Sequence, residues 1–124
     1  MTDFAAVTDV LGTYFDGLYH ADTERLAIVF HPKAIYATAD KVPLLYRTMD
    51  EYFHVVAKRM SPASCGEPRR DVIESIEFAG KNTAFARVRC SIGTKDFIDF
   101  LTLVRTDGAW RIMAKIFQIT ERDI

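Results

Sequence analysis

One carboxylate stands within an otherwise apolar series, and it is the clearest chemical signal in this chain. In residues 83–92, 95–106 and 109–119, apolar side chains recur at every second position, as in strands that bury one face. Asp99 occupies one of the positions on this apolar face. A carboxylate on such a face must be hydrogen-bonded, paired with a cation, or protonated. Asp99 is therefore a candidate acid, base or ligand anchor. The alternative is a structural carboxylate bonded to Tyr14 or to an arginine.

Four further side chains are candidates to share a pocket with Asp99. Tyr14 lies one position before the apolar stripe of an expected N-terminal helix, so its hydroxyl can enter the same space. Tyr36, Thr38 and Asp40 fall on one face of an expected strand, with ordinary strand packing as the alternative. These four residues and Asp99 are predicted ligand contacts, and Asp99 and Tyr14 are also the candidate catalytic pair.

Trp110 is the remaining predicted ligand contact, although filling the interface between helices and sheet is its simpler role. The 3 histidines include no pair at helical or strand spacing, so no metal site is expected. His31 is expected at the end of a helix and His54 on an exposed side of another. Cys65 in a loop and Cys90 in a strand form neither a zinc spacing nor a disulfide framework. No glycine-rich phosphate loop occurs, and we expect no cofactor.

The composition is that of an ordinary globular protein. The chain has 124 residues, 49% hydrophobic and 27% charged, with a net charge of −1. This size predicts a single domain over residues 1–124. The charge gives no bulk attraction to nucleic acid, and no apolar run reaches the length of a membrane span or signal peptide. We therefore expect a cytoplasmic protein that binds neither nucleic acid nor membrane.

The N-terminal half reads as helix. Residues 3–20 carry an apolar stripe at helical spacing, and the glycines at 12 and 17 are expected to allow close packing. Asp22 is a suitable N-cap for a second helix that ends before Pro32. A short hairpin is expected from 34–38 and 43–46. Thr48 and Glu51 form a capping box, which predicts a third helix to about Met60, with Tyr52 or Phe53, Val56 and Met60 as its apolar stripe.

The C-terminal half reads as an antiparallel meander. Turn signals at residues 80–81, 93–94 and 107–108 predict four strands between 71 and 119. With two-residue turns, Val88 faces Asp99 and Asp99 faces Ile116. The inward face then holds Ala84, Ala86, Val88, Cys90, Phe97, Asp99, Leu101, Leu103, Trp110, Ile112, Ala114 and Ile116. Helices followed by such a sheet indicate an α+β fold with helices covering one sheet face.

The opposite face mixes aromatic and cationic side chains. Its predicted members are Phe85, Arg87, Arg89, Phe100, Thr102, Arg111, Met113, Lys115 and Phe117. Single-strand nucleic-acid binders also combine these residue types. The slightly negative net charge and the nearby acidic residues Glu74, Glu77 and Asp96 favour a salt-bridged homodimer surface instead.

The chain resembles the nuclear transport factor 2-like superfamily, and within it the small bacterial proteins classed as "putative lumazine-binding". The resemblance lies in YFDGLYHAD (14–22), RLAIVFHP (25–32), RTMDEYF (47–53), RRDVIESIEFAG (69–80) and DFLTLVRTDGAWRIMAKIF (99–117). It implies a cone-shaped fold, with N-terminal helices on a curved, mainly antiparallel sheet. It also implies pairing of two subunits through the outer sheet face.

The superfamily includes ketosteroid isomerases, scytalone dehydratases and polyketide cyclases. Tyr14 resembles the isomerases' oxyanion-binding tyrosine, but their carboxylate base aligns with Thr38, which cannot accept a proton from carbon. The three histidines do not match the histidine pair of the dehydratases. The first hypothesis is therefore a homodimer that binds a small apolar or aromatic organic molecule between helices and sheet.

Two other hypotheses remain open. The chain is an isomerase-, cyclase- or dehydratase-type enzyme with Asp99 as acid or base and Tyr14 as hydrogen-bond donor. Alternatively, it is a dimeric interaction module without a ligand, in which an ion pair occupies Asp99.

Overall fold

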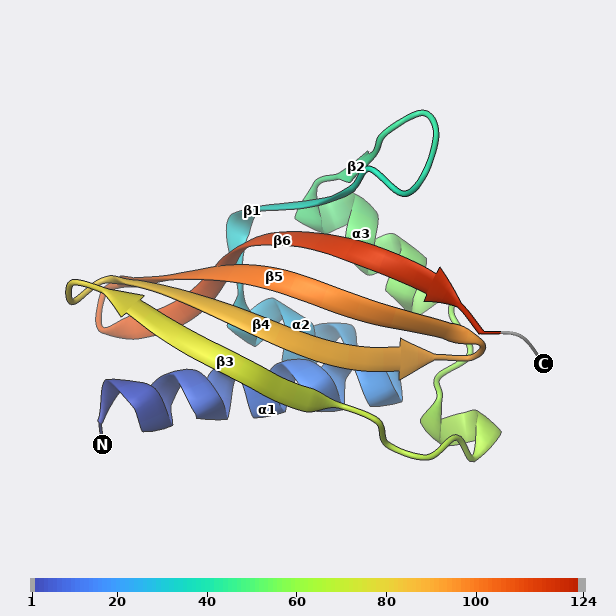
Figure 1. Ribbon diagram of the computed structural model, residues 1–124, viewed down its shortest axis with the longest axis horizontal. Coiled ribbons are helices and arrows are strands. Elements are labelled where there is room, and N and C mark those ends of the chain that lie inside the picture. The colour runs from blue at the N-terminus through green and yellow to red at the C-terminus, as the bar shows by residue number, and fades with distance from the viewer. Residues whose placement is uncertain (1, 123–124) are drawn as a thin grey trace.

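Three helices pack on one face of a six-stranded, mostly antiparallel sheet (Figure 1). The computed structural model describes residues 2–122. The elements are α1 (Asp3–His20), α2 (Thr23–Val29), β1 (Phe30–Thr38), β2 (Leu45–Arg47), α3 (Met49–Ala57), the 3₁₀ turn η1 (Ala63–Cys65), β3 (Val72–Ala79), β4 (Thr83–Ile92), β5 (Lys95–Thr106) and β6 (Ala109–Glu121). The expected α+β class is confirmed. Of the helices within residues 2–122, none combines the length and apolarity that crossing a bilayer requires.

Helix α1 is the longest helix and carries the expected buried stripe. Thr2 caps its first turn, since the Thr2 side chain accepts a hydrogen bond from the Ala5 amide. Gly17 lets α2 approach closely, because a Cβ at this position would lie 2.7 Å from the Leu26 side chain. Gly12 has open space around it and makes no such contact. The close packing predicted for the two glycines therefore holds at Gly17 alone.

The boundary between α2 and β1 differs from the sequence prediction. Asp22 caps α2 as expected, but the helix ends at Val29 and strand β1 already begins at Phe30. Pro32 therefore lies inside a strand. The β1–β6 pairing is interrupted between Phe30 and Ile35, and this irregularity accommodates a residue without an amide hydrogen.

Helix α3 begins at the predicted capping box and ends earlier than predicted. The Thr48 side chain accepts from the Glu51 amide, and the Glu51 carboxylate accepts from the Thr48 amide. The helix ends at Ala57, and Met60 is 75% exposed rather than part of the buried stripe. Tyr52 and Val56 are buried as predicted, together with Met49, so α3 presents Tyr52 to the interior.

The sheet has the strand order β2-β1-β6-β5-β4-β3. Strands β3 to β6 form the predicted meander, while β1 joins β6 in parallel and pairs with β2 as the expected short hairpin. The last turn is built on Asp107 and Gly108, both at positive φ, which suits a tight hairpin of this twist. The four later strands follow the turn signals in the sequence.

The register of β6 changes at a β-bulge. Leu103 faces Ile112 as predicted, but Thr102 then faces Ala114, so Met113 is an extra residue. The predicted pairing of Asp99 with Ile116 is therefore wrong, and Asp99 faces Phe117. A shift of one residue exchanges the two faces of a strand.

The bulge alters the membership of both sheet faces beyond residue 113. Lys115 and Phe117, predicted to lie outside, are 5% and 6% exposed and point toward the helices. Ala114 and Ile116, predicted to lie inside, occupy the outer face, where Ile116 is 43% exposed. The prediction for these four residues was wrong, because a strict two-residue alternation has no place for an extra residue.

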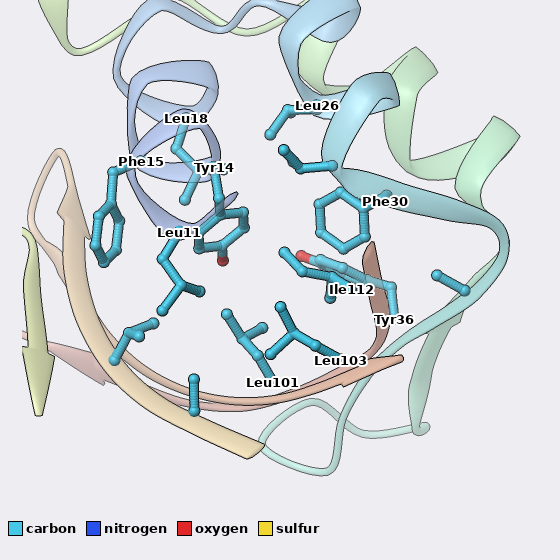
Figure 2. Close-up of a cluster of buried hydrophobic side chains, with 14 of the residues drawn as sticks. Leu11, Tyr14, Phe15, Leu18, Leu26, Phe30, Tyr36, Leu101, Leu103 and Ile112 are labelled. Carbon is cyan, nitrogen blue, oxygen red and sulfur yellow. The ribbon is translucent and has the colours of Figure 1, made fainter. Parts of the chain in front are cut away.

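The core lies between the helices and the curved sheet (Figure 2). Leu11 and Tyr14 of α1 and Phe30 at the start of β1 face Leu101 and Leu103 of β5 across this space. Nearer the β5–β6 turn, Trp110 is 6% exposed and packs edge-on against Phe78 at 5.9 Å. The apolar core thus surrounds the space that holds Asp99.

Candidate functional site

The Asp99 carboxylate is fully buried and bonded to Tyr14. Both side chains have 0% exposure. The Tyr14 hydroxyl donates to Asp99 Oδ2 over 2.5 Å, the short distance typical of a hydrogen bond to a charged oxygen. In Figure 2 the Tyr14 hydroxyl points from α1 toward the sheet. This bond links the first helix to β5.

Lys115 supplies the positive charge beside Asp99. Its Nζ lies 3.9 Å from Asp99 Oδ2, and the lysine is 5% exposed. Four aromatic rings surround the ammonium group, each with its centroid 5.1–5.5 Å from Nζ; they belong to Tyr14, Tyr36, Tyr52 and Phe117. A ring face attracts a cation at this distance, and more strongly where water is excluded. The cage and the carboxylate together keep the lysine charged in the interior.

Burial alone would lower the pKa of Lys115, but the negative charge of Asp99, together with smaller contributions from Tyr52, Tyr36 and Cys90, raises the pKa above its ordinary value of 10.5. The lysine is therefore an ammonium ion at neutral pH. Burial also raises the pKa of the Tyr14 hydroxyl and the Cys90 thiol, with Asp99 adding to both shifts, and burial raises the pKa of Tyr52. These three groups stay protonated.

Several polar atoms in the interior are not satisfied by the protein. Asp99 Oδ1, the Tyr52 hydroxyl and Trp110 Nε1 have no hydrogen-bond partner among residues 2–122, and the first two lie in the cluster around Lys115. The Lys115–Asp99 contact is longer than a hydrogen bond, and Lys115 Nζ donates none within the described chain. The Cys90 thiol gives Asp99 Oδ2 only a weak contact of 3.8 Å. A carboxylate oxygen, a phenol and an ammonium group are thus left without a hydrogen-bond partner in the described chain.

A small cavity adjoins this polar cluster. It has a volume of about 20 Å³, and its lining includes Tyr36, Tyr52 and Lys115. Arg59 and Phe97 also line it and are only half-buried, so they mark its mouth toward the surface. A cavity of this size holds about one water molecule.

The structure brings together three of the predicted site residues. Asp99, Tyr14 and Tyr36 lie around the Lys115 ammonium. Tyr36 also stacks on Tyr52, with the ring centroids 4.5 Å apart. Thr38 is fully buried but donates to the Phe117 carbonyl oxygen over 2.6 Å, so its hydroxyl fixes β1 to β6.

Asp40 and Trp110 lie apart from the cluster. The exposed Asp40 accepts a hydrogen bond from the Ile119 amide over 2.8 Å, which also ties the end of β1 to β6. Trp110 packs against Phe78 and lies under the Arg105 guanidinium, 5.6 Å from its ring centre. Trp110 does not line the cavity beside Lys115.

Sequence reasoning missed Lys115 and gave Tyr52 only a place in a helix stripe. The bulge at Met113 brings Lys115 inward, and no lysine within a strand is expected on an apolar face. One signal was present: Ile112, Met113 and Ala114 are three apolar residues in succession, which breaks the alternation of a half-buried strand.

The histidines and cysteines do not gather into a metal site. Within the described part of the chain, no group of three or more histidine, cysteine, aspartate or glutamate side chains could hold an ion. His54 is exposed on α3, as expected, and its ring contacts the Asp50 carbonyl oxygen. His31, predicted at a helix end, lies in β1, where Nδ1 accepts from the Lys33 amide.

Comparison with known proteins places the chain in a family. A family model described as "Putative lumazine-binding" matches residues 2–118, nearly the whole sequence. The chain belongs to this family. A search of curated proteins finds no match to this family member.

Solved structures share the fold of this lumazine-binding family member. A nuclear transport factor 2-like protein of unknown function from Shewanella baltica OS155 superposes with a TM-score of 0.84 at 24% identity, covering 95% of this chain and 94% of that one. One from Silicibacter pomeroyi DSS-3 gives 0.81 at 24% identity, covering 97% and 100%. A ketosteroid isomerase-like protein from Erwinia carotovora atroseptica gives 0.72 at 11%, covering 94% and 95%. The nuclear transport factor 2-like fold predicted from the sequence is confirmed.

Removing the lysine should strongly destabilise the protein. Lys115→Met leaves the Asp99 carboxylate buried without a cation, and we expect the free energy of unfolding in urea to fall by about 3–5 kcal/mol. Adding Asp99→Asn in that background should recover part of the loss, since the unpaired charge is then gone. Lys95→Met, at an exposed strand position, is the control and should change stability by less than about 0.5 kcal/mol. Equal effects at the two lysines would contradict the ion pair.

Stability should also fall in alkaline solution. Tyr14, Tyr52, Cys90 and Lys115 all have raised folded-state pKa values, so the folded protein keeps protons that the unfolded chain releases. Their contribution is complete below the ordinary thiol pKa of 9.0. It begins to fall as pH passes the ordinary values, 9.0 for the thiol, 10.0 for tyrosine and 10.5 for lysine, and is lost as pH rises through the higher pKa values of the folded protein. Urea midpoints measured from neutral pH upward test this, and Tyr52→Phe should give a shallower decline. A stability that rises with pH would refute it.

Proposed function

We propose that this protein binds a small, planar organic molecule between its helices and its sheet. Lys115 and Tyr52 orient the molecule from the cavity wall, and Asp99 and Tyr14 hold Lys115 in place from behind it. The observation that carries the proposal is the unpartnered Tyr52 hydroxyl, which lines a cavity beside the Lys115 ammonium. A ligand that offers a hydrogen-bond acceptor satisfies this hydroxyl.

The energetic cost of this cluster supports a binding role. A buried polar atom without a partner costs about 1–3 kcal/mol, and a buried ion pair is often less stabilising than packed apolar side chains of the same volume. An interior selected for stability alone would place apolar residues at positions 52, 99 and 115. A ligand that completes the missing hydrogen bonds offsets the cost in the bound form.

The cavity walls favour a flat ring system. Tyr36 and Tyr52 stack on each other, and Phe97 packs 5.9 Å from Phe117, so aromatic faces surround the ammonium group. The family description makes lumazine the first ligand to test. Lumazine is a planar fused ring whose carbonyl oxygens can accept hydrogen bonds from the lysine and from the phenol.

A ligand of that size needs more room than the cavity of about 20 Å³ offers. We infer that the half-buried residues at the mouth, Arg59, Ile92 and Phe97, move outward when the ligand enters. They are the least confined side chains of the lining, and rotamer changes at binding sites are common.

Catalysis is the second hypothesis. The short hydrogen bond from Tyr14 to Asp99 favours it, because such a pair can exchange a proton. Asp99 would have to contact the substrate directly, but it is not among the residues that line the cavity. The polar cluster is better suited to holding a ligand than to reacting with one.

The outer sheet face supports the proposal that two copies of the chain pair. The bulge places Ile116 there beside Phe100, and they are 43% and 42% exposed. They line a hollow of about 220 Å³ together with Ile98. Exposed apolar groups of this kind mark contact surfaces. Glu74 pairs with Arg87 at 3.0 Å and Arg89 at 3.3 Å, so this face is partly neutralised, as predicted for a dimer surface.

Lumazine binding should depend on a hydroxyl that the fold does not need. Tyr52→Phe removes the unpartnered phenol oxygen and keeps the ring, so we expect affinity for lumazine to fall about tenfold while the urea midpoint stays the same or rises. Titration followed by lumazine fluorescence measures the first quantity, and native mass spectrometry of protein from its host reports any retained molecule.

Tyr46→Phe is the matched control for this substitution. Tyr46 is 53% exposed on β2, so its loss of a hydroxyl should change neither affinity nor stability. The proposal fails if neither lumazine nor another planar organic molecule binds, or if Tyr52→Phe and Tyr46→Phe affect binding equally.

Pairing of the chain should depend on the outer apolar patch. Phe100→Glu places a charge at its centre, and we expect the protein to change from dimer to monomer in size-exclusion chromatography with light scattering. Val42→Glu, at a loop residue that is 97% exposed, should leave the dimer intact. A wild-type protein that elutes as a monomer at micromolar concentration would disprove the dimer.

A further inference from the structure

The cavity beside Lys115 has a positive lining. Two of its lining residues, Lys115 and Arg59, are cationic, and none is acidic. Asp99 neutralises one of these charges from behind Lys115, at 3.9 Å. The three ionised groups therefore leave one positive charge in excess, facing the cavity.

The donors of both cations are free to bind a ligand. Lys115 Nζ has aromatic faces around it and makes no hydrogen bond of its own within residues 2–122. Arg59 forms no ion pair with any other described residue. The unpartnered hydroxyl of Tyr52 adds a third donor to the same lining. Three convergent donors, two of them charged, form a receptor for a negatively charged oxygen.

Arg59 lies where it can reach the outer end of a ligand. It follows α3 by two residues, and its half-buried position places it at the cavity mouth, whereas Lys115 is at the buried end. A guanidinium group binds a carboxylate through two parallel hydrogen bonds, and an ammonium group binds it as a point charge. The two cations thus mark an entry path that draws an anion inward.

We propose that the ligand of this site is a planar aromatic carboxylate, whose carboxylate group is held by Lys115, Arg59 and Tyr52. This inference rests on the proposed function and specifies the class of ligand. A monoanion cancels the excess positive charge, and the stacked rings of Tyr36 and Tyr52 adjoin its ring system. A neutral ring compound leaves the charge of Arg59 without a counter-ion at the cavity mouth.

The test compares a charged probe with its uncharged isostere. Naphthalene-2-carboxylate and naphthalene-2-carboxamide have the same shape, and calorimetric titration at neutral pH measures the affinity of each. We expect the carboxylate to bind at least tenfold more tightly than the carboxamide. In Arg59→Gln the affinity for the carboxylate should fall about tenfold, and that for the carboxamide should not change.

Lys58→Gln is the matched control, because it removes the same charge from the neighbouring exposed position. It should change carboxylate affinity less than twofold. Equal binding of the two probes, or no effect of Arg59→Gln, overturns the anion preference while the proposed binding function stands. If neither probe nor lumazine binds, the proposed function and this inference fail together.

Discussion

The contact between the Lys115 ammonium and the Asp99 carboxylate constrains the rest of the structure. Neither charge can be buried alone, because an unpaired ion in the interior costs several kcal/mol. The two must therefore enter the core together, from adjacent strands. This requirement fixes the register of β5 against β6, where Leu101 faces Lys115. Tyr14 adds the third point of attachment by bonding Asp99 from α1, which sets the position of the helix over the sheet.

The bulge at Met113 is the device that makes this contact possible, and it also shapes the other side of the sheet. Moving Lys115 inward brings Ile116 outward, so one extra residue makes the interior more polar and the exterior more apolar. The interior and exterior properties of β6 are thus coupled. The proposed ligand site and the proposed surface for self-association both depend on the same irregularity.

Much of the fold could be predicted from local signals. The caps at Asp22 and Thr48, the glycine turns and the alternation of β4 and β5 are short-range features, and each is present where the sequence places it. The pairing of Tyr14 with Asp99 could also be anticipated, since a buried carboxylate needs a donor. The identity of its cation could not be, because a bulge is decided by packing across strands and leaves only a brief break in periodicity.

The site therefore divides into a predictable and an unpredictable part. Asp99 and Tyr14 can be recognised from their residue types and from their positions in the strand and helix patterns. Tyr52 reaches the site because α3 presents it to the interior, and Lys115 because the bulge turns it inward. Asp40 and Thr38 have the right residue types for a ligand site but serve as links to β6. Polar residues near the end of a strand commonly satisfy backbone groups, and sequence does not distinguish that use from binding.

The placement of the single tryptophan determines what optical experiments report. Trp110 packs against Phe78 and Arg105, and it lies five positions before Lys115 along β6, which corresponds to roughly 15 Å of strand. Its indole emission therefore monitors the folding of the sheet end nearest the β5–β6 turn. Occupancy of the caged ammonium must be observed by other means, such as absorbance of the tyrosines that surround it.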